Sequence, residues 1–168
     1  MKRFLFLMLL GTPALAEAPY DGFMGGVAGC YAASAGIEGG RACVGTGSSA
    51  CFEGAPDGQT TVGMMSCLMA ERDAWDALLN AEYVRAQNAA RAADEAERAS
   101  MPEYAQRDGQ LLTAQRAWIA YRDANCAMEY GAWGGGSMRV IAGADCHLRM
   151  TAERTLELRA YRQTLGDE

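Results

Sequence analysis

The chain contains 168 residues, of which 50% are hydrophobic and 21% are charged, and its formal net charge at pH 7 is −6. These fractions are typical of a globular protein and exclude wholesale disorder. The acidic balance argues against a protein that binds nucleic-acid phosphates, and against one that uses a basic patch to bind a membrane surface.

The first 16 residues predict a signal peptide. Lys2 and Arg3 give a positive start, an unbroken apolar run occupies residues 4–10, and the segment Ala14-Leu15-Ala16 has the small-x-small pattern of a cleavage site. The run is too short to span a bilayer, and no cysteine follows the cleavage site where a lipid anchor would attach. We therefore expect a soluble periplasmic or secreted protein with no membrane span or lipid anchor. Cleavage would remove two cations and no acid, which changes the net charge from −6 to −8.

The chain has six cysteines and one histidine. An even number of cysteines in an exported protein predicts three disulfides, although six cysteines allow fifteen pairings and the residues alone do not choose among them. A zinc site is the alternative, but no Cys-x-x-Cys motif occurs and His147 is the only imidazole, so we expect no metal. The predicted disulfide cysteines are Cys30, Cys43, Cys51, Cys67, Cys126 and Cys146.

Residues 17–59 form a segment rich in Gly, Ala and Ser, which we name the N-terminal arm. Short helices are predicted for residues 26–35, which carry Cys30, and for residues 41–52, which carry Cys43 and Cys51. The arm is too rich in glycine to fold alone. Disulfides are therefore expected to hold it against a helical domain formed by residues 60–168.

A long helix is predicted from about residue 62 to residue 98, with Thr61 as its N-cap. Apolar side chains recur at intervals of three and four residues and mark one buried face. Residues 87–99 contain no helix breaker but have little apolar surface to bury. The predicted buried row consists of Leu68, Trp75, Leu79, Tyr83 and Ala86.

Two more long helices are predicted. Ser100, Pro102 and Glu103 have the pattern of a helix start, which predicts a helix over about 102–130. The glycine-rich segment 131–137 ends it, and a loop is expected to about residue 145. A last helix then begins near Cys146 and ends at Gly166. The predicted buried residues are Leu111, Leu112, Trp118, Ile119 and Cys126 in the second long helix, and Leu148, Thr151, Leu158, Tyr161 and Leu165 in the third.

No alternating strand pattern of useful length occurs. We therefore predict an all-α fold, in which three main helices form a small bundle preceded by the Gly-rich, disulfide-tied arm.

The sequence contains no recognisable catalytic constellation. His147 has no evident activated serine or free cysteine as a partner, and no Gly-x-Ser-x-Gly motif occurs. Carboxylates such as Asp73 and Asp76 lie at helical spacing on polar faces, where solvated surface is the default. The glycines at 134–136 lack the Lys-Ser/Thr that follows a phosphate loop. We expect neither an enzyme nor a cofactor.

The segment AQRAWIAYRDANC, residues 114–126, places charged side chains beside the apolar row of the second long helix. Arg122 falls next to that row and needs a carboxylate partner. Two interpretations stay open, an ion pair with Asp73 or Asp76 of the first long helix, or an exposed ligand contact. The residues of interest in this segment are Gln115, Trp118, Arg122 and Asp123.

That segment, the GGGS run at 134–137, Cys146 and Thr151-x-x-Arg154 resemble the LprI-like lysozyme-inhibitor domain family of exported bacterial proteins. Met64-x-x-Cys67 and Trp75-Asp76-x-x-Leu79-Asn80-x-x-Tyr83 fit the same family, and the resemblance covers about residues 51–161. It implies a small helical domain with disulfides Cys51–Cys67 and Cys126–Cys146, which leaves Cys30 and Cys43 to pair in the arm. The chain departs from the family in its segment 18–50 and in lacking the lipid anchor of the protein for which the family is named.

The resemblance implies an exported protein that inhibits lysozyme. Our hypothesis for the mechanism is that a rigid loop occludes the enzyme's cleft. The candidate contact is the loop of Trp133, Gly134, Gly135, Gly136 and Ser137, because glycine permits close backbone approach and tryptophan offers an aromatic anchor. In the alternative for this loop, Trp133 packs beneath it and the glycines only allow the turn. In the alternative for the protein, it is a structural or envelope-binding module with no enzyme target. The expected partner is therefore lysozyme or another envelope protein, and the oligomeric state stays open.

Overall fold

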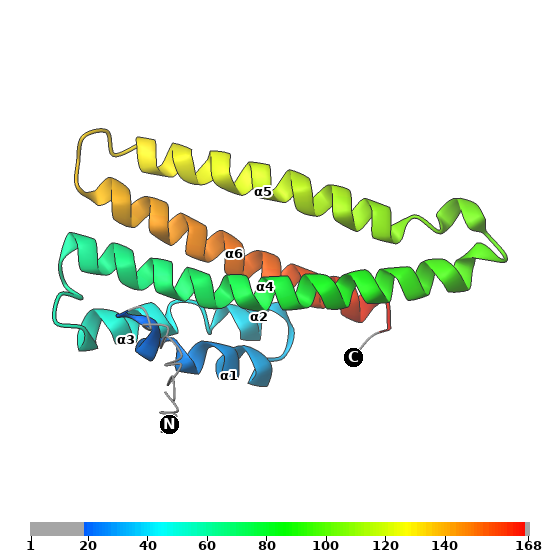
Figure 1. The fold of residues 1–168 in the computed structure, drawn as a ribbon, viewed down its shortest axis with the longest axis horizontal. Coiled ribbons are helices and arrows are strands. Elements are labelled where there is room, and N and C mark those ends of the chain that lie inside the picture. Colours follow the sequence, from blue (N-terminus) through cyan, green and yellow to red (C-terminus); the bar gives the residue numbers. More distant parts are fainter. Residues whose placement is uncertain (1–18, 167–168) are drawn as a thin grey trace, which may run out of the picture.

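The computed structural model describes residues 19–166, and the predicted signal peptide lies outside them. The arm holds a 3-10 turn (Asp21–Phe23) and the short helices α1 (Gly25–Ala33), α2 (Gly36–Arg41) and α3 (Thr46–Gly54). The long helices α4 (Thr61–Arg98), α5 (Arg107–Gly131) and α6 (Met138–Thr164) run alternately in opposite directions (Figure 1). The described residues contain no strand, so the predicted all-α class with three main helices and a disulfide-tied arm is confirmed.

Helix α4 begins one residue earlier than predicted and ends at the predicted residue. The predicted cap, Thr61, is wrong, because Thr61 is the first helical residue. The cap is Thr60, whose hydroxyl accepts the amide hydrogen of Gly63 at 2.9 Å. Gly63 must be glycine because a Cβ there would lie 1.9 Å from the carbonyl oxygen of Asp57. The predicted row is confirmed for Leu68, Trp75, Leu79 and Ala86, which are buried, whereas Tyr83 is partly exposed.

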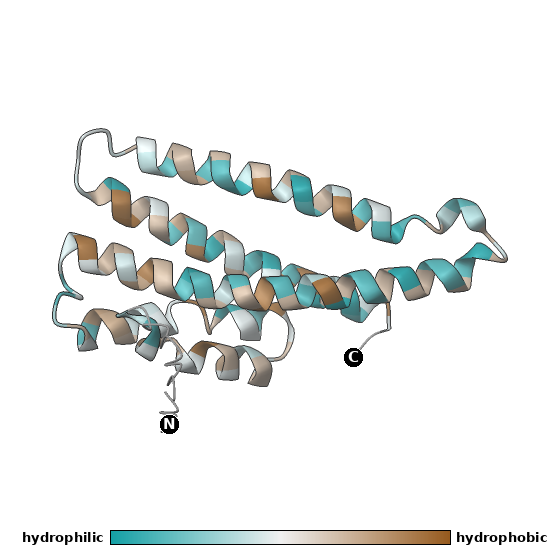
Figure 2. Cartoon of the chain, in the orientation of Figure 1, coloured by the Kyte–Doolittle hydropathy of each residue, from teal (hydrophilic) through white to brown (hydrophobic). Residues whose placement is uncertain are grey.

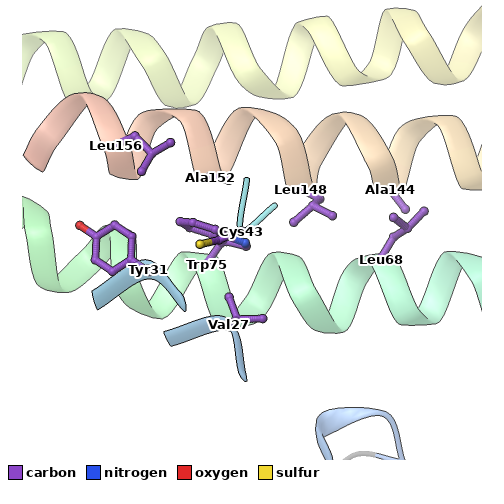
Figure 3. Packing of buried hydrophobic residues seen from close by; sticks show 9 residues of the cluster. All are labelled: Val27, Tyr31, Cys43, Leu68, Trp75, Ala144, Leu148, Ala152 and Leu156. Atoms are coloured by element: carbon purple, nitrogen blue, oxygen red, sulfur yellow. The ribbon is translucent and has the colours of Figure 1, made fainter. Parts of the chain in front are cut away.

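The main core lies between α4, α6 and the arm (Figure 3). The Trp75 side chain of α4 is fully buried, and its ring meets that of Tyr31 from α1 edge-on, with 5.7 Å between centroids. Leu148 and Leu156 supply the α6 side of this core. The last turns of α4 project beyond it and are largely hydrophilic, as Figure 2 shows.

The arm is divided differently from the prediction. Helix α1 matches the predicted 26–35, but the predicted helix 41–52 is wrong: α2 ends at Arg41 and α3 begins at Thr46. Gly45 separates them because its φ of +91° is a left-handed conformation that glycine adopts without strain. Cys43 therefore lies in the connecting turn. It pairs with Cys30, and Cys51 of α3 pairs with Cys67 of α4.

Two buried charged side chains fix the arm to the long helices. The Glu71 carboxylate of α4 accepts the amide hydrogens of Gly45 and Ser48, both at 2.7 Å, and so caps the start of α3. Arg159 of α6 donates to the carbonyl oxygens of Tyr31 and Gly36 at 3.0 and 2.9 Å, where α1 ends and α2 begins. The arm is therefore held by polar contacts as well as by its disulfides.

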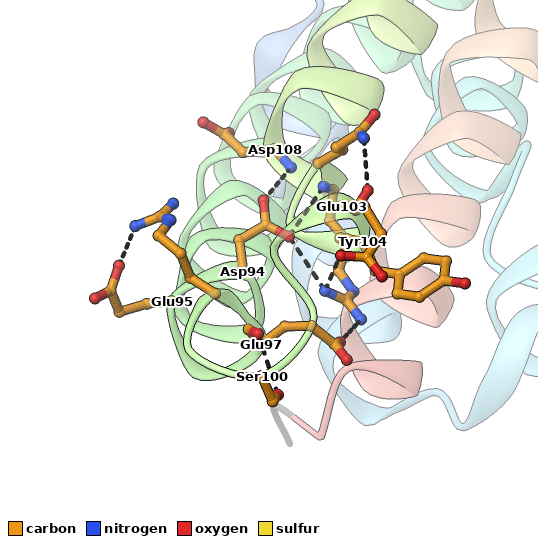
Figure 4. Close-up of polar contacts among 10 residues, drawn as sticks. Asp94, Glu95, Glu97, Ser100, Glu103, Tyr104 and Asp108 are labelled. Atoms are coloured by element: carbon orange, nitrogen blue, oxygen red, sulfur yellow. Dashed lines mark hydrogen bonds and ion pairs between the residues drawn. The ribbon is translucent and has the colours of Figure 1, made fainter.

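Helix α5 begins at Arg107 and not at the predicted residue 102, because Pro102–Tyr104 form only a 3-10 turn. The cap comes from Asp94 of α4, whose carboxylate accepts the amide hydrogens of Arg107 at 3.0 Å and Asp108 at 3.1 Å (Figure 4). Burial raises the Asp94 pKa, but the hydrogen bonds from these two amides and from the Arg107 side chain outweigh it and lower the pKa below its ordinary value.

Two further expectations for the helices are wrong. Leu112 and Ile119 are exposed, because α5 packs through a narrow face on which Leu111, Gln115 and Cys126 are buried. The predicted loop is too long, since α6 begins at Met138 rather than near Cys146. The reversal needs only the residues between α5 and α6, where Gly134 adopts a φ of +51°.

Helix α6 ends close to its predicted boundary. Its last helical residue is Thr164, and Gly166 follows with a φ of +84°. Of the predicted face, Leu148, Thr151 and Leu158 are buried, while Tyr161 and Leu165 are partly exposed.

Candidate functional site

The loop between α5 and α6 contains the candidate inhibitory residues Trp133–Ser137. It lies at the end of the long helices where α4 begins (Figure 1). All five residues are exposed, and Trp133 keeps 50% of its surface accessible. About half of the Trp133 surface is therefore open to solvent.

Hydrogen bonds hold this loop in one shape. The Gly136 amide donates to the Trp133 carbonyl oxygen at 2.9 Å, and the Gly134 amide donates to that of Gly131 at 3.0 Å. The Arg139 guanidinium donates to the Gly134 carbonyl oxygen at 3.3 Å and lies 5.6 Å from the centre of the Tyr130 ring. The loop thus presents its tryptophan from an ordered turn.

The third disulfide anchors the helices that carry the loop. Cys126 of α5 and Cys146 of α6 are bonded, with their Cα atoms 5.4 Å apart, so all three disulfides are those implied by the family resemblance. The Met150 sulfur lies 3.8 Å from each of these two sulfur atoms. Because both cysteines are buried, the link fixes the spacing of α5 and α6 near the loop.

The residues of the 114–126 segment bind α5 to α6. The Gln115 side-chain oxygen accepts from Nε of Arg154 at 2.9 Å, and Arg122 and Arg154 both lie over the Trp118 ring, at 4.9 and 6.0 Å from its centroid. Arg122 pairs with Asp123 at 2.9 Å, so the predicted pairing with Asp73 or Asp76 is wrong. The segment contributes to packing through hydrogen bonds and cation–π contacts.

His147 lies on α6 near this segment. Burial lowers its pKa, and the positive charges of Arg122 and Arg72 lower it further, against the opposing effect of Asp123. Within residues 19–166 no three His, Cys, Asp or Glu side chains are grouped so that they could hold a metal ion. The same part of the chain contains no helix both long and apolar enough to cross a bilayer.

The sequence analysis missed residues 138–145, which it assigned to the loop. Val140 and Gly143 of this segment line an open groove together with Met65 of α4 and Tyr130 of α5. The adjacent Val140 and Ile141, which precede Ala144 and Leu148 at helical spacing, were the available signal that a helix had already begun.

Two proteins are similar to this chain in sequence. An uncharacterized 17.7 kDa protein in the puhA 5' region of Rhodobacter capsulatus is 30% identical over 155 residues, which cover 92% of each chain. The Rhizobium meliloti (strain 1021) protein R02472 is 43% identical over 49 residues, so the match spans 35% of that relative and 29% of this chain. No solved structure matches. The family model described as Lysozyme inhibitor LprI matches residues 51–158, and the chain therefore belongs to the LprI lysozyme-inhibitor family.

Proposed function

We propose that this protein is exported, binds lysozyme, and inhibits it by inserting the Trp133–Ser137 loop into the enzyme's cleft. Family membership supports the lysozyme target. We choose this loop as the contact surface because Trp133 is half-exposed on it and because a disulfide joins the two helices that hold it. Large aromatic side chains held in this way are the usual energetic centres of protein interfaces.

The chemistry of the loop suits a glycosidase cleft. Such a cleft holds two carboxylates that flank the scissile bond. The glycines at 134–136 allow the backbone to approach closely, and Arg139 places a positive charge against the loop. Arg139 contacts the Gly134 carbonyl oxygen and the Tyr130 ring, both uncharged, and we expect its charge to attract a carboxylate in the cleft.

The overall charge favours encounter with a cationic enzyme. The chain carries a net charge of −6. Opposite net charges accelerate association, and salt slows it. Inhibition of a cationic lysozyme should therefore weaken as ionic strength rises.

The test is a muramidase turbidity assay with the oxidised protein, its Trp133→Ala variant and a matched control, Tyr104→Ala. Tyr104 is 61% exposed and lies in the 3-10 turn before α5, at the far end of the long helices. We expect Trp133→Ala to weaken inhibition at least ~tenfold, equivalent to ~1.4 kcal/mol, while Tyr104→Ala leaves it unchanged. Neither change should shift the melting temperature.

Two results would contradict the proposal in different ways. Equal inhibition by the wild type and Trp133→Ala would exclude the loop as the contact surface. Failure of the folded, fully oxidised wild type to inhibit any of several lysozymes would exclude the function itself. An envelope-binding module would then become the better hypothesis.

A further inference from the structure

Helix α5 presents a nearly uncharged face to solvent. It forms one edge of the molecule, the upper edge in Figure 1, and packs against α6 on its inner side. From Gly109 to Gly131 its only exposed charged residues are Arg116 and Asp123, although the outer face of a surface helix is usually charged and polar. Helix α4 provides the contrast, since its exposed residues include the charged Asp73, Arg85, Arg91, Glu95 and Arg98.

The exposed face of α5 contains large apolar side chains. Tyr121 and Met128 lie seven residues apart on one stripe, and they keep 63% and 66% of their surface accessible. They do not belong to the narrow side of Leu111, Gln115 and Cys126 through which α5 packs. Apolar side chains that gather on one exposed surface are typical of interaction sites.

A row of small residues runs beside Tyr121 and Met128. Its members are three or four residues apart, which places them on one side of the helix, and all of them are exposed. Short side chains let a second helix approach closely, because the distance between two packed helices depends on the side chains at their contact. The row consists of Thr113, Ala117, Ala120, Ala124 and Ala127.

Gly109 and Gly131 extend this row by one turn at each end. Glycine inside a helix, as at position 109, is less stable than alanine. A Cβ at either position would meet nothing within 4 Å, so no contact within the described chain requires glycine there. A neighbour from outside the chain that comes close to the helix backbone would require it.

The row is symmetric about Ala120. Gly109 and Gly131 are equally far from Ala120 along the helix, and so are Thr113 and Ala127. Two antiparallel copies of α5 that cross at Ala120 would therefore match small residues along the whole contact. A contact in which each copy uses the same surface is the usual basis of a two-fold symmetric dimer.

The two exposed charges match the same register. Arg116 and Asp123 lie two turns apart on one edge of the row, before and after Ala120. In the antiparallel pair Arg116 of each copy faces Asp123 of the other, so symmetry forms the same ion pair twice. Asp123 can accept this second partner because its side chain is 55% exposed despite its ion pair with Arg122. This self-complementary charge favours a second copy of the chain as the partner.

We propose that two copies of this protein associate as an antiparallel dimer through α5, with Ala120 at the two-fold axis. One pair of helices makes a contact at the small end of specific interfaces, so we expect a reversible dimer with a Kd of ~1–100 μM. The centre of the contact lies ~17 Å along α5 from Gly131, where the helix ends and the candidate inhibitory loop follows. Dimerisation is measured without lysozyme, so its failure would not bear on the proposed inhibition.

Sedimentation velocity of the oxidised protein tests for the dimer. Concentrations from ~1 to ~500 μM span the expected Kd, and ~0.15 M salt screens the repulsion between two acidic copies. The sedimentation coefficient of the wild type should rise with concentration toward that of a dimer. Ala120→Arg places bulk and like charge at the axis and should weaken association at least ~tenfold. Ala81→Arg, the same change at an exposed position of α4, should leave association unchanged, and both variants should keep the wild-type melting temperature.

A charge exchange tests the antiparallel register. Arg116→Asp should weaken association at least ~threefold, because two carboxylates then face each other at each of the symmetric pairs. The double variant Arg116→Asp/Asp123→Arg restores opposite charges across the axis, so it should regain the wild-type Kd.

Three results would overturn the proposal. In the first, the wild type sediments as a monomer over the whole concentration range, which would assign this face of α5 to a different partner. In the second, Ala120→Arg associates as tightly as the wild type. In the third, the double charge variant associates as weakly as Arg116→Asp.

Discussion

Replacing Glu71 with glutamine tests how strongly one buried carboxylate holds the arm in place. Glu71 is fully buried and accepts three hydrogen bonds, from the amides of Gly45 and Ser48 at 2.7 Å and from the Trp75 indole at 3.2 Å. Glutamine has almost the same volume, but it carries no charge and turns an NH2 group toward one of these donors.

The expected loss of stability follows from these contacts. One buried N–H is left without an acceptor, which costs about 1–3 kcal/mol, and each remaining bond loses its charge assistance, which costs about a further 0.5–1 kcal/mol. Two bonds remain, so we expect Glu71→Gln to lower the free energy of unfolding by about 2–5 kcal/mol. Glu53→Gln, an exposed change on α3, should have little effect.

Urea unfolding of the oxidised proteins measures the loss, and amide hydrogen exchange locates it. The Ser48 amide should exchange faster in Glu71→Gln, since the start of α3 loses its cap. A free energy of unfolding within about 0.5 kcal/mol of wild type, or unchanged exchange at Ser48, would refute the role assigned to this carboxylate.

Two further predictions concern α5. Asp94→Asn should destabilise the protein at neutral pH. Because the folded-state pKa of Asp94 is lowered, its contribution is complete above the unfolded-state pKa and is lost as pH falls through the folded-state value, so urea unfolding of wild type and variant should converge in strong acid. A difference that persists undiminished in acid would show that ionisation is not the cause. The Cys126–Cys146 disulfide joins residues 20 apart in sequence. Changing both cysteines to serine should lower the free energy of unfolding by about 3 kcal/mol in the chain-entropy model. An unchanged melting temperature in that double variant would contradict this constraint.

The sequence predicts the long helices best where burial alone decides the outcome. Trp75 and Leu79 of α4 lie at the spacing of one face, and they pack in the two clusters that α4 forms with α6. The predicted start of α5 was wrong because Ser100 and Pro102 have the pattern of a local helix start. The residue that caps α5 is Asp94, which lies thirteen residues before Arg107. A cap supplied by another helix has no local signature.

The candidate site was predicted only in part. The glycines of the loop predict the turn from the sequence alone. The exposure of Trp133 depends on the spacing of the ends of α5 and α6. The Cys126–Cys146 disulfide helps to fix that spacing. Leu112 and Ile119 share a stripe with Cys126, yet α5 is covered on one narrow side, so only Cys126 is buried. Periodicity indicates that a helix has an apolar stripe and does not tell how much of it a neighbour covers.

The disulfide pattern has a consequence for the order of oxidative folding. Each bond joins cysteines that are consecutive along the chain, so a polypeptide that crosses a membrane N-terminus first could close each pair before the next cysteine emerged. An oxidase acting in that order would produce the native set without any reshuffling by an isomerase. Arg159 binds the carbonyl oxygens of Tyr31 and Gly36 from more than 120 residues away, so the arm would be covalently closed well before Arg159 could bind it.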